Sequence, residues 1–135
     1  MGRKLAREET MKLLYQMDMN NDYSESSVKD FIENGELNKE EKEYISSSAV
    51  TILKNLDTID KNISQNIRGW KISRLAKVDL SILRIAIYEL LYREDIPIEV
   101  CINEAIEIAK KYSTEESSKF INGMLGNFVR TMENR

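Results

Sequence analysis

Histidine is absent from this chain, and cysteine and proline each occur once among its 135 residues. Without histidine the chain lacks the most common general base and has no Ser-His or Cys-His catalytic pair. A single cysteine cannot form an internal disulfide, and no cysteine–histidine spacing typical of zinc sites is present. The residue inventory therefore argues against an enzyme, a metal centre and a bound cofactor.

Glycine is also scarce, and long apolar runs are missing. Five glycines and one proline leave long uninterrupted windows for helices, and no window alternates strictly between polar and apolar residues. No segment is apolar enough for a membrane span or a signal peptide, which predicts a cytoplasmic protein without membrane contact. The length predicts one domain, residues 1–135, large enough to need no covalent staples.

The most informative segment is residues 74–92. Its apolar residues go right round a helical wheel, so other helices must bury it. They are Val78, Leu80, Ile82, Leu83, Ile85, Ala86, Ile87, Leu90 and Leu91. After Pro97 a second helix carries an apolar stripe at Ile98, Ile102, Ala105, Ala109 and Tyr112. A buried helix followed by an amphipathic one predicts an all-helical domain.

Helical periodicity extends over most of the remaining chain. The pattern predicts helices at residues 4–17, 27–33 and 57–67. It predicts three more that begin after the capping residues Asn38, Ser73 and Thr114. Glu41 stands three residues after Asn38, which is typical of a capping box. The expected fold class is therefore all-α, with about seven helices.

Acidic and basic residues are distributed unevenly, although the net charge is only −3. Residues 22–60 carry ten acidic residues against four lysines, whereas residues 61–93 carry seven basic residues against two acidic ones. A weakly acidic protein can still bind nucleic acid if its basic residues share one surface. On charge alone, solvation of helix surfaces is the better interpretation.

Four segments resemble one known family. They are REETMKLLYQMD at residues 7–18, DLSILRIAIYELLY at 79–92, IPIEVCINEAIEIAKKY at 96–112 and SSKFINGMLGNFVR at 117–130. Together they are similar to the NusB family of bacterial transcription antitermination factors, over nearly the whole chain. The resemblance implies two small helical bundles packed side by side.

The resemblance also implies function and partners. It implies binding of the boxA element of nascent ribosomal RNA, together with NusE, a small-subunit ribosomal protein. The pair would then join other Nus factors on RNA polymerase and suppress termination. Such work is recognition and scaffolding, without covalent chemistry.

Three basic residues, Arg3, Lys4 and Arg7, begin the first predicted helix. Positive charge at a helix N-terminus opposes the helix dipole and costs about 0.3–1 kcal/mol of stability per residue. This placement suggests either phosphate contact or a solvated, frayed terminus. The family's N-terminal helix carries an arginine-rich RNA-binding start, so the resemblance favours RNA.

The only tryptophan, Trp70, lies in a glycine-containing connector beside Lys71 and Arg74. An aromatic ring among basic residues can stack a base while the cations neutralise phosphates. The alternative is a ring that covers the seam between two bundles. An aromatic near the RNA surface in the family favours RNA contact by Trp70, Lys71 and Arg74. Tyr15 is left open between core and RNA surface.

Charged residues interrupt the most apolar helix at Asp79, Arg84 and Glu89. Buried charges must be paired or hydrogen-bonded, so structural pairing is expected there. Cys101 stands between two β-branched residues and is expected to be a buried thiol rather than a nucleophile.

Two alternatives to an antitermination factor remain open. Similar helical domains begin certain ribosomal RNA cytosine methyltransferases, but the sequence to Arg135 shows neither a Rossmann-type glycine motif nor the catalytic cysteine of that class. The second alternative is a helical adaptor that binds only protein through its acidic segments. Retention on single-stranded RNA separates an adaptor from an RNA-binding protein. The sequence decides neither the oligomeric state nor the surface that meets NusE.

Overall fold

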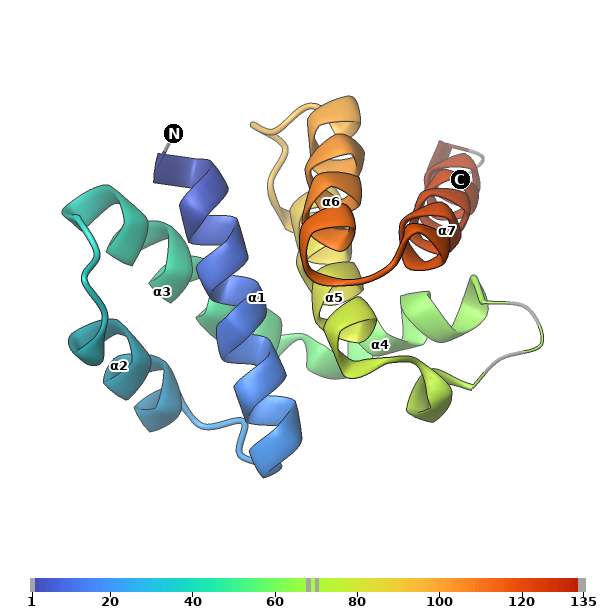
Figure 1. The fold of residues 1–135 in the computed structure, drawn as a ribbon. Coiled ribbons are helices and arrows are strands. Elements are labelled where there is room, and N and C mark those ends of the chain that lie inside the picture. Colours follow the sequence, from blue (N-terminus) through green and yellow to red (C-terminus); the bar gives the residue numbers. More distant parts are fainter. Residues whose placement is uncertain (1, 68, 70, 134–135) are drawn as a thin grey trace.

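The computed structural model describes residues 2–67, 69 and 71–133, and within them the chain is helical with no strand (Figure 1). Seven α-helices and one short 3-10 helix follow in the order α1 (Gly2–Asn20), α2 (Glu25–Asn34), α3 (Lys39–Lys54), α4 (Leu56–Gln65), η1 (Ile72–Arg74), α5 (Lys77–Tyr92), α6 (Ile98–Tyr112) and α7 (Glu115–Glu133). The predicted all-α class with about seven helices is confirmed.

Two small bundles lie side by side. Helices α1, α2 and α3 pack together on the left of Figure 1, and α4, α6 and α7 lie on the other side of α5. Helix α5 contacts α1 and α3 as well as α4, α6 and α7. It is therefore the common core of both bundles.

Burial of α5 follows directly from its composition. Every residue from Asp79 to Glu89 is buried, including the three charged ones. The prediction of a helix that is enclosed on all sides is therefore confirmed. The helix is also free of glycine and proline, so its backbone hydrogen bonds run without interruption.

Helix α1 is also buried on more than one side, because it lies against both α3 and α5. The predicted stripe is buried throughout, with Ala6, Thr10, Leu13, Leu14 and Met17 at most 2% exposed. Arg7, Glu8 and Met11 are buried as well. The helical period predicted a single stripe of buried residues. Because α1 packs against two helices, the buried surface is wider than that stripe.

The local signals at helix ends were correct at two positions and wrong at one. Asn38 and Glu41 form a reciprocal capping box at the start of α3. Thr114 Oγ1 accepts from the backbone N–H of Ser117 at the start of α7. The prediction that Ser73 caps α5 was wrong, because Ser73 lies inside η1 and α5 begins after Ala76 without a side-chain cap.

The predicted stripe of α6 was partly wrong. Ile98 is 40% exposed, and the buried residues of the helix are Cys101, Ala105, Ile108 and Ala109. Ile98 is the first residue of α6, at the end of the molecule where the α5–α6 loop turns. Among the described residues no helix is long and apolar enough to cross a bilayer.

Candidate nucleic-acid interface

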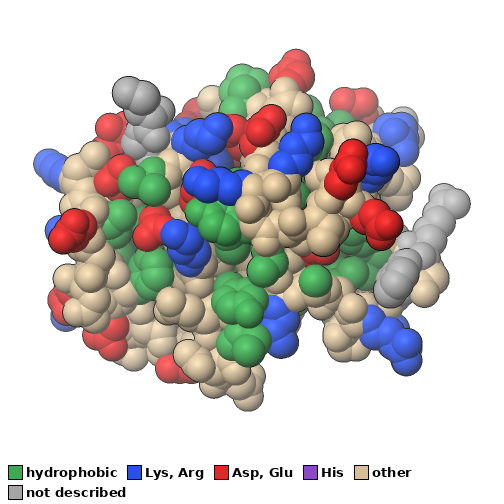
Figure 2. Space-filling view, in the orientation of Figure 1, with side chains coloured by type: hydrophobic (Ala, Val, Ile, Leu, Met, Phe, Trp, Pro, Cys, Tyr) green, Lys and Arg blue, Asp and Glu red, His purple; other side chains and the backbone are tan. Residues whose placement is uncertain are grey.

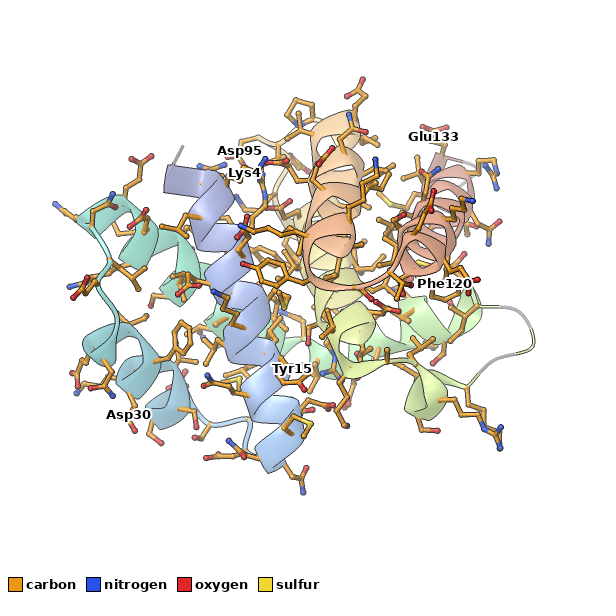
Figure 3. All side chains as sticks on the ribbon, viewed as in Figure 1. Lys4, Tyr15, Asp30, Asp95, Phe120 and Glu133 are labelled. Atoms are coloured by element: carbon orange, nitrogen blue, oxygen red, sulfur yellow. The ribbon has the colours of Figure 1, made fainter. Side chains whose placement is uncertain are left out.

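The predicted basic residues of α1 divide into exposed and buried ones. Arg3 and Lys4 are exposed in the first turn, and Figure 3 labels Lys4 at this end of the molecule. No carboxylate of the described residues lies within 4.0 Å of either cation. The Arg3 guanidinium lies 5.5 Å from the centroid of the Tyr44 ring, which restricts its position.

Arg7, by contrast, points into the interior and is 4% exposed. Its Nε donates to Glu89 Oε2 at 2.8 Å, and its Nη1 donates to Glu104 Oε1 at 3.2 Å. The Tyr44 hydroxyl donates to the same oxygen of Glu89 at 2.5 Å. We call these four residues the Arg7 cluster. It joins α1, α3, α5 and α6.

The Arg7 cluster holds one cation and two carboxylates, and these charges shift the pKa values of Arg7 and Tyr44. Burial by itself would lower the pKa of Arg7, but the Glu89 carboxylate offsets this and leaves that pKa raised. Burial, and then the charge of Glu89, raise the pKa of Tyr44. Arg7 thus stays charged, Tyr44 stays neutral, and the guanidinium has little surface left for a phosphate.

Lys71 and Arg74 are exposed beside and within η1. In Figure 1 this short helix lies at the lower right, whereas α1 begins at the upper left. Arg74 lines a pocket of about 340 Å³ with Asp79, Ser117 and Phe120. The predicted basic residues therefore form two separate groups. Trp70 lies outside the described residues, and its predicted RNA contact stays a prediction from the sequence.

The three charges that interrupt α5 all have partners, as expected. Asp79 accepts from Ser113 Oγ at 2.8 Å and from Ser117 Oγ at 2.7 Å. Arg84 makes two hydrogen bonds to Asp60, at 2.9 and 2.8 Å. Glu89 belongs to the Arg7 cluster. These pairings stabilise charges that would otherwise be buried alone.

Two further side chains were considered from the sequence. Cys101 is buried, as expected, and burial raises the pKa of its thiol to about 12, which disfavours the reactive thiolate form. Tyr15 is half-buried in the C-terminal half of α1 (Figure 3), and this exposure decides for neither of the two alternatives, core or RNA surface. Among the described residues no three metal-ligating side chains form a cluster.

Charge of one sign does not dominate the face shown in Figure 2. Lys and Arg side chains are mixed there with Asp and Glu. Selective binding of a polyanion at such a face depends on a few cations without carboxylate partners, together with groups that read a base. Arg3 and Lys4 are cations of that kind.

Sequence reasoning did not find Glu104 and Tyr44 as partners of Arg7. Glu104 stands in the segment INEA, residues 102–105, and Tyr44 stands in the helix predicted after Asn38. The pairs Arg7–Glu89 and Arg7–Glu104 join residues 82 and 97 positions apart, so no local pattern reveals them.

Comparison with known proteins gives a consistent result. Residues 4–130 match the model of the NusB family. The transcription antitermination protein NusB of Acetivibrio thermocellus is 48% identical over 130 residues, covering 96% of this chain and 90% of the relative. The corresponding protein of Clostridium botulinum is 48% identical over 132 residues, covering 96% and 99%.

Solved structures agree with this result. NusB of T. maritima superposes with a TM-score of 0.87 at 41% identity, covering 95% of this chain and 90% of that one. A structure of the antitermination factors NusB and NusE in complex with double-stranded RNA gives a TM-score of 0.87 at 26% identity, covering 96% and 97%. On its sequence and its fold, this chain belongs to the NusB family.

Proposed function

We infer that this chain is a transcription antitermination factor that binds boxA-type RNA together with NusE. The observation that carries this inference is its near full-length similarity to antitermination proteins, joined to the fold of a NusB that is seen with NusE and RNA. Other Nus factors and RNA polymerase complete the expected assembly. The protein acts in the cytoplasm, where transcription takes place.

The proposed mechanism is recognition without covalent chemistry. The chain has no histidine, and its buried carboxylates are engaged in structural hydrogen bonds. The methyltransferase alternative gains no support from the relatives, since this chain covers 90% and 99% of the two antitermination proteins described above. RNA binding would begin at Arg3 and Lys4, with Lys71 and Arg74 as a second basic group. Arg7 keeps a structural role in this proposal.

The function is tested with a boxA-like RNA in a gel-shift titration, with and without NusE. We expect weak binding by the chain alone, because only a few cations are exposed without carboxylate partners. NusE should tighten binding by extending the contact surface. Equal affinity with and without NusE would contradict the joint mode of binding. Absence of binding under both conditions would favour the protein-only adaptor.

A second expected result concerns the N-terminal cations. Replacing both Arg3 and Lys4 by alanine should weaken RNA binding at low salt. It should also reduce the slope of log affinity against log salt by up to about two, because each phosphate contact releases counterions. The thermal midpoint should stay unchanged or rise slightly, since the two cations oppose the dipole of α1.

Two matched variants complete this experiment. Replacing both Lys71 and Arg74 by alanine tests the second basic group. The measurement is again the slope of log affinity against log salt. Replacing Lys54 and Lys61 by alanine removes the same charge from α3 and α4 and should leave the slope unchanged. A slope that falls equally in all three variants would show that only net charge matters.

A further inference from the structure

A surface pocket of about 410 Å³ opens where α1 begins, between the start of α3 and the α5–α6 loop. One wall is apolar and consists of Ile96, Pro97 and Val100. The rest is charged and includes the exposed cations Arg3 and Lys4. Figure 3 labels Lys4 and Asp95, which both line the pocket, close together at this end of the molecule.

The apolar wall faces solvent. Val100 is 39% exposed although it lies among charged residues, and Pro97 beside it is exposed too. A single exposed valine is ordinary, but one that lines a pocket with a proline presents an apolar surface to whatever enters. A flat ring is the kind of group that such a wall can contact.

A carboxylate of the Arg7 cluster lines the pocket one turn of α6 beyond Val100. Glu104 Oε1 accepts from Arg7, and no described side chain donates to its other oxygen. The side chain of Glu104 is 23% exposed and lines the pocket. Because Arg7 is buried and held by Glu89, the position of Glu104 is fixed before any ligand arrives.

The balance of charge indicates which part of a nucleotide fits. Three cations line the pocket, and so do three carboxylates: Glu40, Asp95 and Glu104. Arg93 already engages both oxygens of Asp95, at 2.9 and 2.8 Å. A pocket with nearly balanced charge is poorly suited to a phosphate but suited to an uncharged ring with hydrogen-bond donors. Arg3 and Lys4 then lie near the phosphates on either side of that ring.

We propose that this pocket holds one unpaired base of a bound RNA strand, with the ring against Pro97 and Val100 and an exocyclic amino group donating to Glu104. This inference rests on the proposed function and adds a site of base selection to it. Cytosine, adenine and guanine carry such an amino group and uracil does not. Uracil offers only its ring N3–H, which lies between two carbonyl oxygens that the Glu104 carboxylate repels. The pocket therefore favours the amino-bearing bases over uracil.

The test compares two labelled 12-nucleotide RNAs, all cytidine and all uridine, by fluorescence anisotropy with the full chain. We expect the cytidine RNA to bind about tenfold more tightly, the effect of one hydrogen bond to a charged group. In Glu104→Gln the amide oxygen stays on Arg7, so the amide NH2, a donor, replaces the free carboxylate oxygen in the pocket. The affinity ratio of cytidine to uridine RNA should then fall toward one. Glu107→Gln, one turn further along α6, loses the same charge and should keep the ratio.

A second variant puts a charge into the apolar wall and leaves the four residues of the Arg7 cluster unsubstituted. Val100→Asp should weaken binding of both RNAs about tenfold, whereas Met19→Asp, at the far end of α1 and 55% exposed, should not. Equal binding of the two RNAs by the unaltered chain would overturn the proposal. So would an unchanged ratio in Glu104→Gln, or equal effects of Val100→Asp and Met19→Asp. Binding of neither RNA by the unaltered chain, even with NusE, would also overturn the base pocket, whereas the proposed function is decided separately by the boxA titration.

Discussion

Replacing Glu89 by leucine is expected to lower the free energy of unfolding by about 3–5 kcal/mol. The change removes the main partner of Arg7, which is 4% exposed and cannot reach water without moving α1. It also leaves the Tyr44 hydroxyl without its acceptor. Urea unfolding followed by circular dichroism measures this loss from the shift of the midpoint at constant slope.

The double variant in which Arg7 becomes methionine and Glu89 becomes leucine is the informative companion. Removing both charges takes away the desolvation cost along with the attraction, so much of the lost stability should return. Lys12→Met, which breaks the exposed pair with Glu9, should change stability little. A single Glu89 variant as stable as the Lys12 variant would show that the Arg7 cluster contributes nothing to the fold.

Leu83→Ala is expected to cost about 2–5 kcal/mol of stability. Leu83 is fully buried in the middle of α5, so the change leaves a cavity at the helix that both bundles share. For a chain of this size the loss corresponds to a fall in the thermal midpoint of roughly 10 °C. Because α5 belongs to both bundles, unfolding should remain a single transition.

Leu5→Ala is the matched control for this prediction. It makes the same chemical change at a residue of α1 that is 42% exposed, and it should shift the midpoint little. If Leu83→Ala instead produced two separate transitions, the two bundles would be independent folding units. The role assigned to α5 as a common core would then be wrong.

The parts of the fold that the sequence predicted are those fixed by nearby residues. The capping box of Asn38 and Glu41 spans three positions, and the apolar surround of α5 lies within one helix. Both depend on the local backbone, so the helical period and residue type suffice to predict them. The assignment of Ser73 as a cap failed because η1 inserts a turn before α5 begins.

The parts that the sequence missed depend on residues far apart. Arg7 was predicted to be a surface cation because it follows Arg3 and Lys4 and precedes two glutamates. Contacts with α5 and α6, which are remote in sequence, bury it. In α6 two overlapping stripes share Ala105 and Ala109, and contact with neighbouring helices decides which of them is buried. Arg3 and Lys4 were among the predicted site residues on charge, but the apolar wall beside them comes from the α5–α6 loop and the first turn of α6.

The long-range partners of α1 also set an order of events during synthesis. Glu8 accepts from Lys111 and Tyr112, at 2.8 Å each, and these residues follow it by 103 and 104 positions. A nascent chain therefore contains all of α1, α2 and α3 before any of the groups that neutralise Arg7 and Glu8 has been made. Closing a loop of that length costs about 2 kcal/mol more than closing one of ten residues. The polar inner side of α1 thus stays hydrated on the ribosome, and the first helix to emerge reaches its final packing only when α5 and α6 have docked.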